Sequence, residues 1–418
     1  MHTTLILKKM KMTVKKQGIS AVIKMLIGQI VWAPLCPLLE RLYSNKPISK
    51  NQILFISKPD YSDNAYYLFD YLKKRKGCEQ YSYIWLVDSK GEYAVKDSNV
   101  TFCNKYSAWH SGLSRDALKA VLTSKYIFFT HASPLHKLKK RSDQTIVNLW
   151  HGCGYKSIKS TNEWEKENPF DYALVPGKVF VETKSVFWAC AKEKILTIGY
   201  PRYDEFKNVS ASTKKLYSSI KGDKKKLIVW MPTYRKTELG QFAVSKIQGF
   251  FELPILKSEA DLLALDQYCT DAETVICIKR HHYQLRYQCE ELELKSIRFI
   301  DDSDINSAGA SLYGLLACVD GLVTDYSSVA IDFMLLDKPI GFTLDDFKEY
   351  GETQGFVFDD PLEYMPGDHI YSFDDFMNFI AEIVNNEDRY RDNRLSIMDE
   401  VHNPCDGYCK RICDYFNI

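Results

Sequence analysis

Short apolar runs that alternate with helical segments are the feature that most constrains the fold of this chain. From residue 51 onward these runs have the length of buried strands, and several segments between them carry apolar residues at helical spacing. Strands are expected at residues 53–56, 83–87, 126–129, 145–150, 171–175, 195–198, 227–231, 274–278, 297–300 and 317–323, and the clearest helices at 64–74, 117–124 and 258–268. Strands separated by helices predict parallel sheets with helices on both faces.

One segment resembles a linker between domains. Residues 208–226 are rich in Ser, Lys and Gly, and an alternating series of strands and helices lies on each side of them. We therefore expect two doubly wound α/β domains, at residues 51–215 and 216–418. A chain of 418 residues is long enough for two or three domains.

Composition excludes several classes of function. The net charge of +1 provides no global field that would attract nucleic acid. The twelve cysteines form no CxxC pair, which favours a reduced setting and gives no zinc motif. Asp301, Asp302 and Asp304 lie close together in the sequence, but we expect them in a solvated loop, so no metal site and no cofactor are predicted.

The first fifty residues differ from the rest. Six lysines, at positions 8, 9, 11, 15, 16 and 24, precede or enter an apolar segment at residues 25–39 that contains Pro34 and Pro37. The segment is shorter than the about 20 residues of a spanning helix, and its prolines would interrupt one. A basic, apolar segment is typical of attachment to an anionic membrane surface; a helix packed on the protein's own core is the alternative.

The strand at residues 317–323 ends in a polar turn. This turn contains Asp325, Ser327 and Ser328 and leads into apolar residues at helical spacing. Serine caps helix starts, and the free N–H groups of a helix start can bind phosphate oxygens. The alternative is an ordinary capped strand–helix unit without a ligand.

Other polar side chains also follow predicted strands. They are His151, Arg202, Thr233 with Arg235, and Lys279 with His281. Ligands of open parallel sheets bind outside the carboxyl ends of the strands. Cations with serine and backbone donors would suit a phosphate-bearing ligand, and a neutral histidine can take a proton from an attacking hydroxyl.

Six ordered motifs resemble those of the CDP-glycerol glycerophosphotransferase family, which includes teichoic acid primases and polymerases of Gram-positive bacteria and similar capsule enzymes. The family patterns WHGTPLK, GYPRND, APTWR, K/R-x-H-P, ITDYSSxxFDF and RGFYFD are similar to residues 150–156, 199–204, 231–235, 279–282, 323–333 and 354–359. The chain departs from these patterns at Cys153-Gly154, Tyr203, His282 and Gln354.

The resemblance implies a GT-B-like fold, with two Rossmann-type domains facing a central cleft, on the cytoplasmic face of the membrane. It implies transfer of glycerol phosphate or ribitol phosphate from a CDP-linked donor to a hydroxyl of a lipid-linked glycan, teichoic acid or capsular polymer, with release of CMP. His151 and His281 would then be the catalytic pair. The implied donor-binding residues are Thr233, Arg235, Lys279, Asp325, Ser327 and Ser328, with Gly152 and Arg202 elsewhere in the cleft.

Three other functions are open to comparison. A GT-B glycosyltransferase that uses a nucleotide sugar would share the fold and the anion site. A non-catalytic carrier would tolerate the loss of both histidines. A hydrolase is disfavoured, because the sequence contains neither GxSxG nor HExxH.

Overall fold

The computed structural model describes residues 35, 37–93, 97–107, 112–135, 138–157, 169–233, 253–279 and 292–418. The predicted residues Arg235 and His281 lie outside these ranges, as does most of the basic N-terminal segment. Two compact units are formed within the described parts of residues 1–151, 163–174 and 413–418, and of residues 152–162 and 175–412, respectively.

The first sheet has the strand order β3-β2-β1-β4-β5-β6-β7. Its strands are β1 (Ser49–Ile56), β2 (Ser82–Val87), β3 (Val100–Asn104), β4 (Ser124–Phe129), β5 (Thr145–Asn148), β6 (Tyr172–Leu174) and β7 (Ile195–Leu196), and neighbouring strands from β3 to β6 are all parallel. Helices α3 (Asp63–Lys74), α4 (Arg115–Thr123) and α6 (Phe180–Trp188) alternate with them. The order reverses between β1 and β4, as in a Rossmann fold, and such a switch point is where ligands of these sheets bind.

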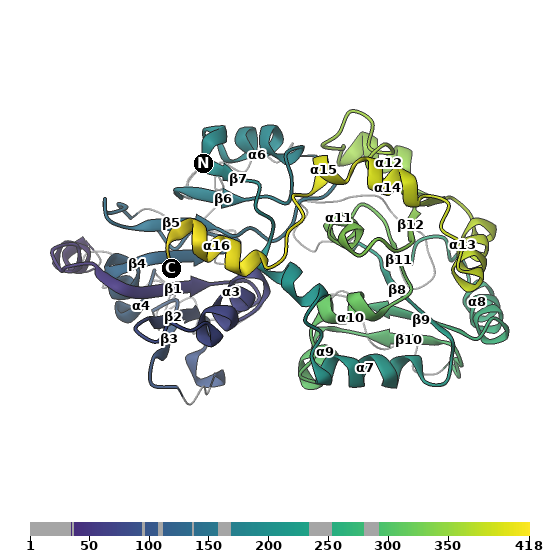
Figure 1. The fold of residues 1–418 in the computed structure, drawn as a ribbon, viewed down its shortest axis with the longest axis horizontal. Coiled ribbons are helices and arrows are strands. Elements are labelled where there is room, and N and C mark those ends of the chain that lie inside the picture. The colour runs from purple at the N-terminus through teal and green to yellow at the C-terminus, as the bar shows by residue number, and fades with distance from the viewer. Residues whose placement is uncertain are drawn as a thin grey trace, which may run out of the picture. The chain divides into compact units, whose positions relative to one another are not determined.

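The second sheet has the order β10-β9-β8-β11-β12-β13 and is parallel throughout (Figure 1). Its strands are β8 (Lys226–Met231), β9 (Thr274–Lys279), β10 (Ile297–Ile300), β11 (Gly321–Thr324), β12 (Ile340–Thr343) and β13 (Asp368–Ile370). Its helices are α7 (Ala211–Lys221), α8 (Glu259–Asp271), α9 (Asp302–Ser307), α10 (Leu312–Cys318), α11 (Ser328–Phe333), α12 (Phe347–Thr353), α13 (Phe373–Asn385), α14 (Arg391–Ser396) and α15 (Met398–Val401). Here the order reverses between β8 and β11. The two expected parallel, Rossmann-like sheets are thus confirmed.

Apolar side chains on both faces explain why the strands are buried. In the second unit Trp230 on β8 packs edge to face on Phe376 of α13, with ring centroids 4.9 Å apart. Helix α13 lies close to its sheet because β11 and β12 carry Gly321 and Gly341, where a Cβ would come within 2.5 Å of Ile383 and 3.0 Å of Phe379, respectively. In the first unit Phe55 of β1 stacks on Phe128 of the neighbouring β4.

The segment that resembled a linker is a helix. Residues 211–221 form α7, because the Ser210 side chain accepts the Thr213 N–H at 3.1 Å and caps the helix start. Thr213 and Ile220 are buried on its inner face. The change from the first sheet to the second falls between β7 and β8, and the expected domain boundary at residues 215 and 216 stays a prediction.

The described end of the N-terminal segment has two different faces. Residues 37–44 are helical, and Tyr43 is buried with Leu118 and Leu122 of α4. Leu35, Leu38 and Leu42 are exposed, at 43%, 65% and 53%. No helix in the described ranges combines the length and the hydropathy that crossing a bilayer requires.

Candidate functional site

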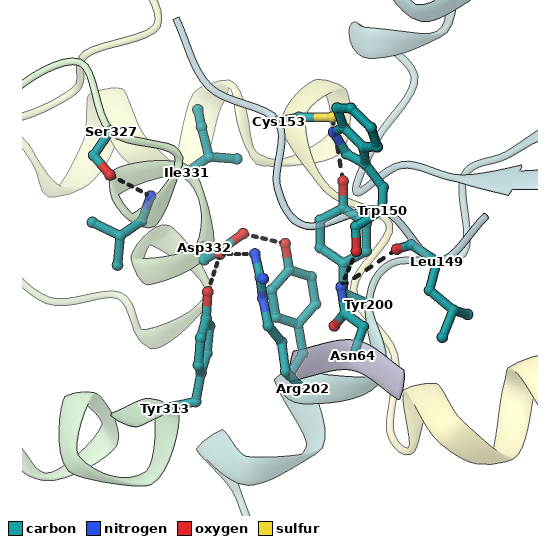
Figure 2. A network of polar contacts seen from close by, with 12 residues as sticks. Asn64, Leu149, Trp150, Cys153, Tyr200, Arg202, Tyr313, Ser327, Ile331 and Asp332 are labelled. Atoms are coloured by element: carbon teal, nitrogen blue, oxygen red, sulfur yellow. Dashed lines mark hydrogen bonds and ion pairs between the residues drawn. The ribbon is translucent and has the colours of Figure 1, made fainter. Parts of the chain in front are cut away.

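His151 follows β5 at the end of a strained turn. Trp150 has a φ of +55°, which is uncommon for a bulky residue. Its N–H donates to Asn148 Oδ1 at 3.0 Å, and its carbonyl oxygen accepts from Asn64 Nδ2 at 2.8 Å (Figure 2). Asn64 is fully buried on α3. The turn that presents His151 is therefore held from both sides.

One ring nitrogen of His151 has a defined role. Nδ1 lies 3.1 Å from the carbonyl oxygen of Thr130, the residue after β4. A carbonyl oxygen only accepts, so Nδ1 carries the proton of this hydrogen bond. In the neutral ring Nε2 is then the basic nitrogen, as a proton acceptor requires.

Gly152, Gly154, Arg202 and Ser328 meet in the second unit. Gly152 has a φ of +140°, and a Cβ on it would lie 2.5 Å from Ser328 Oγ and 3.3 Å from Arg202 Nη2. A Cβ on Gly154 would lie 2.9 Å from the Ser328 backbone nitrogen. Both positions require glycine, because the backbone of residues 152–154 packs directly on the start of α11. The structure thus brings together the predicted residues Gly152, Arg202 and Ser328.

The residues after Gly154 pair with another predicted motif. Val357 N–H donates to the Tyr155 carbonyl at 2.8 Å, and Ser157 N–H donates to the Gly355 carbonyl at 2.9 Å. The buried Tyr155 hydroxyl donates to the Tyr364 carbonyl at 2.8 Å. The motifs at residues 150–156 and 354–359 are therefore in contact through residues 155–157.

Arg202 is the cation of a buried ion pair. Its Nη2 lies 2.6 Å from Asp332 Oδ2, and the two side chains are 5% and 0% exposed. Asp332 also accepts from the hydroxyls of Tyr203 and Tyr313 (Figure 2). The Arg202 guanidinium lies 4.7 Å from the ring centre of Tyr313. Arg202 thus holds α11 through a buried ion pair. Tyr203, at which the chain departs from the family pattern, donates to the same carboxylate.

Asp325 and Thr233 are paired at the switch point of the second sheet. The fully buried Asp325 carboxylate accepts from the Thr233 N–H at 2.9 Å and from the Thr233 hydroxyl. The pair joins the carboxyl ends of β8 and β11. Asp325 therefore positions Thr233.

Ser327 and Ser328 are half-buried at the start of α11. Ser327 is the N-cap, and its hydroxyl accepts from the Val329 N–H at 3.4 Å. The helix has six residues and continues into a 3₁₀ turn at Met334–Leu336. Both serines follow β11, as the sequence predicted.

Lys279 ends β9 and forms an ion pair with Asp302 at 2.8 Å.

The expectation that Asp301, Asp302 and Asp304 lie in a solvated loop is wrong, because Asp301 and Asp304 form the capping box of α9. Within the described ranges no cluster of His, Cys, Asp and Glu has the arrangement of a metal site.

Cys153 is not a nucleophile of this site. Burial raises the pKa of its thiol, and its sulfur lies 3.3 Å from the Tyr200 hydroxyl. A reactive cysteine needs the opposite environment, one that favours the thiolate. The thiol packs the turn between Gly152 and Gly154.

Sequence reasoning missed several residues that hold the site. Asp332 lies inside the recognised motif at residues 323–333 and Asn64 at the start of the expected helix at 64–74, but neither was assigned a role there. Thr130 and His131 directly follow the predicted strand at 126–129, so the rule that identified His151 also applies to them. His402 lies in no recognised motif, and only the fold brings its Nε2 within 2.7 Å of the Ile331 carbonyl.

Replacement of Asp332 by Ala should destabilise the protein by about 3–5 kcal/mol, because the buried Arg202 guanidinium would lose its carboxylate. Urea unfolding followed by tryptophan fluorescence measures this loss. Asp406→Ala removes the exposed partner of Lys207 and is the matched control, with no measurable change expected. Equal stability of the Asp332 variant and the wild type would contradict the structural role of the ion pair.

Stability should fall when the pH drops below 6.5, in part through His402. Burial lowers the pKa of this histidine below its usual 6.5, and Nδ1 has no hydrogen-bond partner among the described residues. Between the lowered pKa and 6.5 the unfolded chain binds more protons than the folded protein, so acidification favours unfolding. Urea midpoints at pH 7.5 and 5.5 should differ less for His402→Gln than for the wild type; an unchanged difference would exclude this contribution.

Comparison with known proteins agrees with these motifs. The family model described as CDP-Glycerol:Poly(glycerophosphate) glycerophosphotransferase matches residues 38–415. A teichoic acid poly(glycerol phosphate) polymerase of Bacillus spizizenii is 28% identical over 76% of this chain and 80% of its own length. A teichoic acid glycerol-phosphate transferase of Staphylococcus aureus is 26% identical over 89% of this chain and 94% of its own length.

A solved structure shares the fold. The wall teichoic acid polymerase TagF, in a variant soaked with CDPG, superposes with a TM-score of 0.70 at 22% identity, over 96% of this chain and 97% of that chain. The match of the family model covers most of the chain and contains the resembling motifs. The chain belongs to the CDP-glycerol:poly(glycerophosphate) glycerophosphotransferase family, and the resemblance in the sequence is confirmed.

Proposed function

We propose that this protein transfers glycerol phosphate or ribitol phosphate from a CDP-linked donor to a hydroxyl of a lipid-linked glycan, teichoic acid or capsular polymer, and releases CMP. Membership of the family supports the reaction class. Relatives named as glycerol-phosphate and as ribitol-phosphate polymerases support both donors. The observation that carries the proposal is the orientation of His151, whose Nδ1 is committed to a carbonyl oxygen, so that Nε2 can act as a base.

The proposed step is a direct displacement at phosphorus. The acceptor hydroxyl gives its proton to His151 Nε2 while its oxygen forms a bond to the phosphorus that carries the polyol. The bond from that phosphorus to the bridging oxygen of the diphosphate breaks, and CMP leaves with the electron pair. The proton on His151 then passes to solvent, so the enzyme returns to its starting state. Catalysis of this kind depends mainly on positioning and on donors for the developing negative charge.

Donor binding is proposed for Thr233, Arg235, Lys279, Ser327 and Ser328, with His281 as the second catalytic group. Asp325 contributes through Thr233, whose N–H and hydroxyl it holds at the end of β8. Gly152 contributes through Ser328, on which it packs, and Arg202 contributes through its ion pair with Asp332 of the same helix. Lys279 would exchange its contact with Asp302 for a donor phosphate.

Replacement of His151 by Ala should lower the rate of CMP release by about 10²- to 10⁴-fold, the usual effect of losing a well-placed acid or base. The assay follows CMP release from CDP-glycerol and from CDP-ribitol in the presence of a lipid-linked acceptor analogue. His369→Ala is the matched control, because His369 lies on β13 and contacts the Met365 carbonyl. Near wild-type release by His151→Ala would exclude the base, and consumption of UDP-, GDP- or CMP-sugars instead of CDP-polyols would identify a glycosyltransferase.

We also propose that the protein binds the cytoplasmic face of the membrane as a peripheral protein. The basic and apolar residues of the first fifty positions support this, as do the exposed side chains of Leu35, Leu38 and Leu42. Tyr43 anchors the same segment to the first unit, with its hydroxyl accepting from Arg115 Nε at 3.1 Å. Attachment and anchoring thus use different side chains of one segment.

Replacement of Leu35, Leu38 and Leu42 together by Ser should weaken binding to vesicles that contain phosphatidylglycerol, since exposed apolar area and charge both favour interfacial binding. Flotation of the protein with such vesicles measures the bound fraction. Leu263→Ser, at an exposed leucine of α8, is the control. Undiminished flotation of the triple variant would assign attachment to another surface.

A further inference from the structure

A second histidine lies against His151. The imidazole of His131 is parallel to that of His151, with ring centroids 4.1 Å apart and an angle of 11° between the planes. His131 is two residues beyond the end of β4, and β4 pairs with β5, the strand that leads to His151. The contact is therefore fixed by neighbouring strands of one sheet.

Thr130 connects the two rings. Its carbonyl oxygen accepts from His151 Nδ1 at 3.1 Å, and its hydroxyl lies 2.9 Å from His131 Nδ1. Thr130 is fully buried, and its N–H donates to the Ile56 carbonyl at the end of β1. The residue thus lies at the switch point between β1 and β4, where the backbone is held by the sheet.

These contacts restrain the two rotatable bonds of the His151 side chain. The hydrogen bond to Thr130 fixes the direction of Nδ1, and the stacked ring of His131 fixes the plane of the imidazole. Nε2 then points in one direction. A base that is displaced by about 1 Å can lose about 10²-fold in rate, so such restraints matter for proton transfer.

We propose that Thr130 and His131 are positioning residues that hold the imidazole of His151 in its reactive orientation. The proposal rests on the proposed role of His151 as the base. In this proposal His131 acts through the face of its ring and Thr130 acts through its hydroxyl. His131 transfers no proton.

Three variants test the two assignments. His131→Ala removes the stacked ring, His131→Phe keeps an aromatic face without ring nitrogens, and Thr130→Val removes the hydroxyl but keeps the carbonyl oxygen that binds His151. His131→Ala should lower kcat for CMP release by about 10- to 100-fold and leave the KM for CDP-glycerol or CDP-ribitol unchanged. His131→Phe should recover most of this loss, Thr130→Val should show a smaller loss, and His369→Ala should equal the wild type.

A measurement that does not depend on activity completes the test. In protein labelled with ¹³C and ¹⁵N at histidine, the imidazole resonances of His151 are those that disappear in His151→Ala. They should shift in His131→Ala and stay in place in His369→Ala. The thermal midpoint of each variant shows that it is folded.

Two results would overturn the positioning role: a wild-type kcat together with unshifted His151 resonances in His131→Ala, or a His131→Phe variant as slow as His131→Ala. The second result would assign the function to the ring nitrogens of His131 instead of its face. If His151→Ala still releases CMP while the resonances shift in His131→Ala, the ring contact is real, and the proposed function of His151 is wrong.

Discussion

The buried ion pair between Arg202 and Asp332 is the interaction on which the second unit's candidate site depends. Asp332 lies on α11, the helix that begins with Ser328, and Arg202 lies in the 3₁₀ turn Pro201–Phe206 after β7. Charges are buried at a large cost in desolvation, which only good geometry and additional hydrogen bonds offset. Here the hydroxyls of two tyrosines supply those bonds. The pair therefore fixes the position of one particular helix start.

The two Rossmann-like units place polar groups by the same rule. In each sheet the strand order reverses once, and the side chains that follow the two strands at that point are close to each other. In the first unit the backbone of Thr130 contacts Ile56, and in the second Asp325 contacts Thr233. The first pair supports an imidazole, whereas in the second the amide and the hydroxyl of Thr233 both donate to the Asp325 carboxylate. One topology thus holds polar groups at the switch point of each sheet.

Much of this could be predicted from the sequence, because strands buried on both faces leave clear apolar runs. The strands β3, β12 and β13 were not predicted, since they mix polar residues or glycine with apolar ones. Helix α7 was not predicted, because a serine cap and two buried residues outweigh a composition typical of loops.

The candidate site was predicted less completely than the fold. Motifs placed Gly152, Arg202 and Ser328 in one site, and the structure brings these three together. Motifs could not show that Asp325 and Lys279 contact protein groups, because ion pairs and hydrogen bonds between distant residues leave no local pattern. The same limit applies to the contact of His131 with His151, which depends on the register of β4 and β5.

The close approach of Gly154 to the Ser328 amide has a consequence for protein engineering. A designer who restores the family consensus would place Thr-Pro at positions 153 and 154. A proline ring at position 154 would collide with the backbone at the start of α11, because even a Cβ atom at this position would lie 2.9 Å from the Ser328 backbone nitrogen. Consensus replacement at this position is thus not neutral, and it succeeds only if the start of α11 moves at the same time.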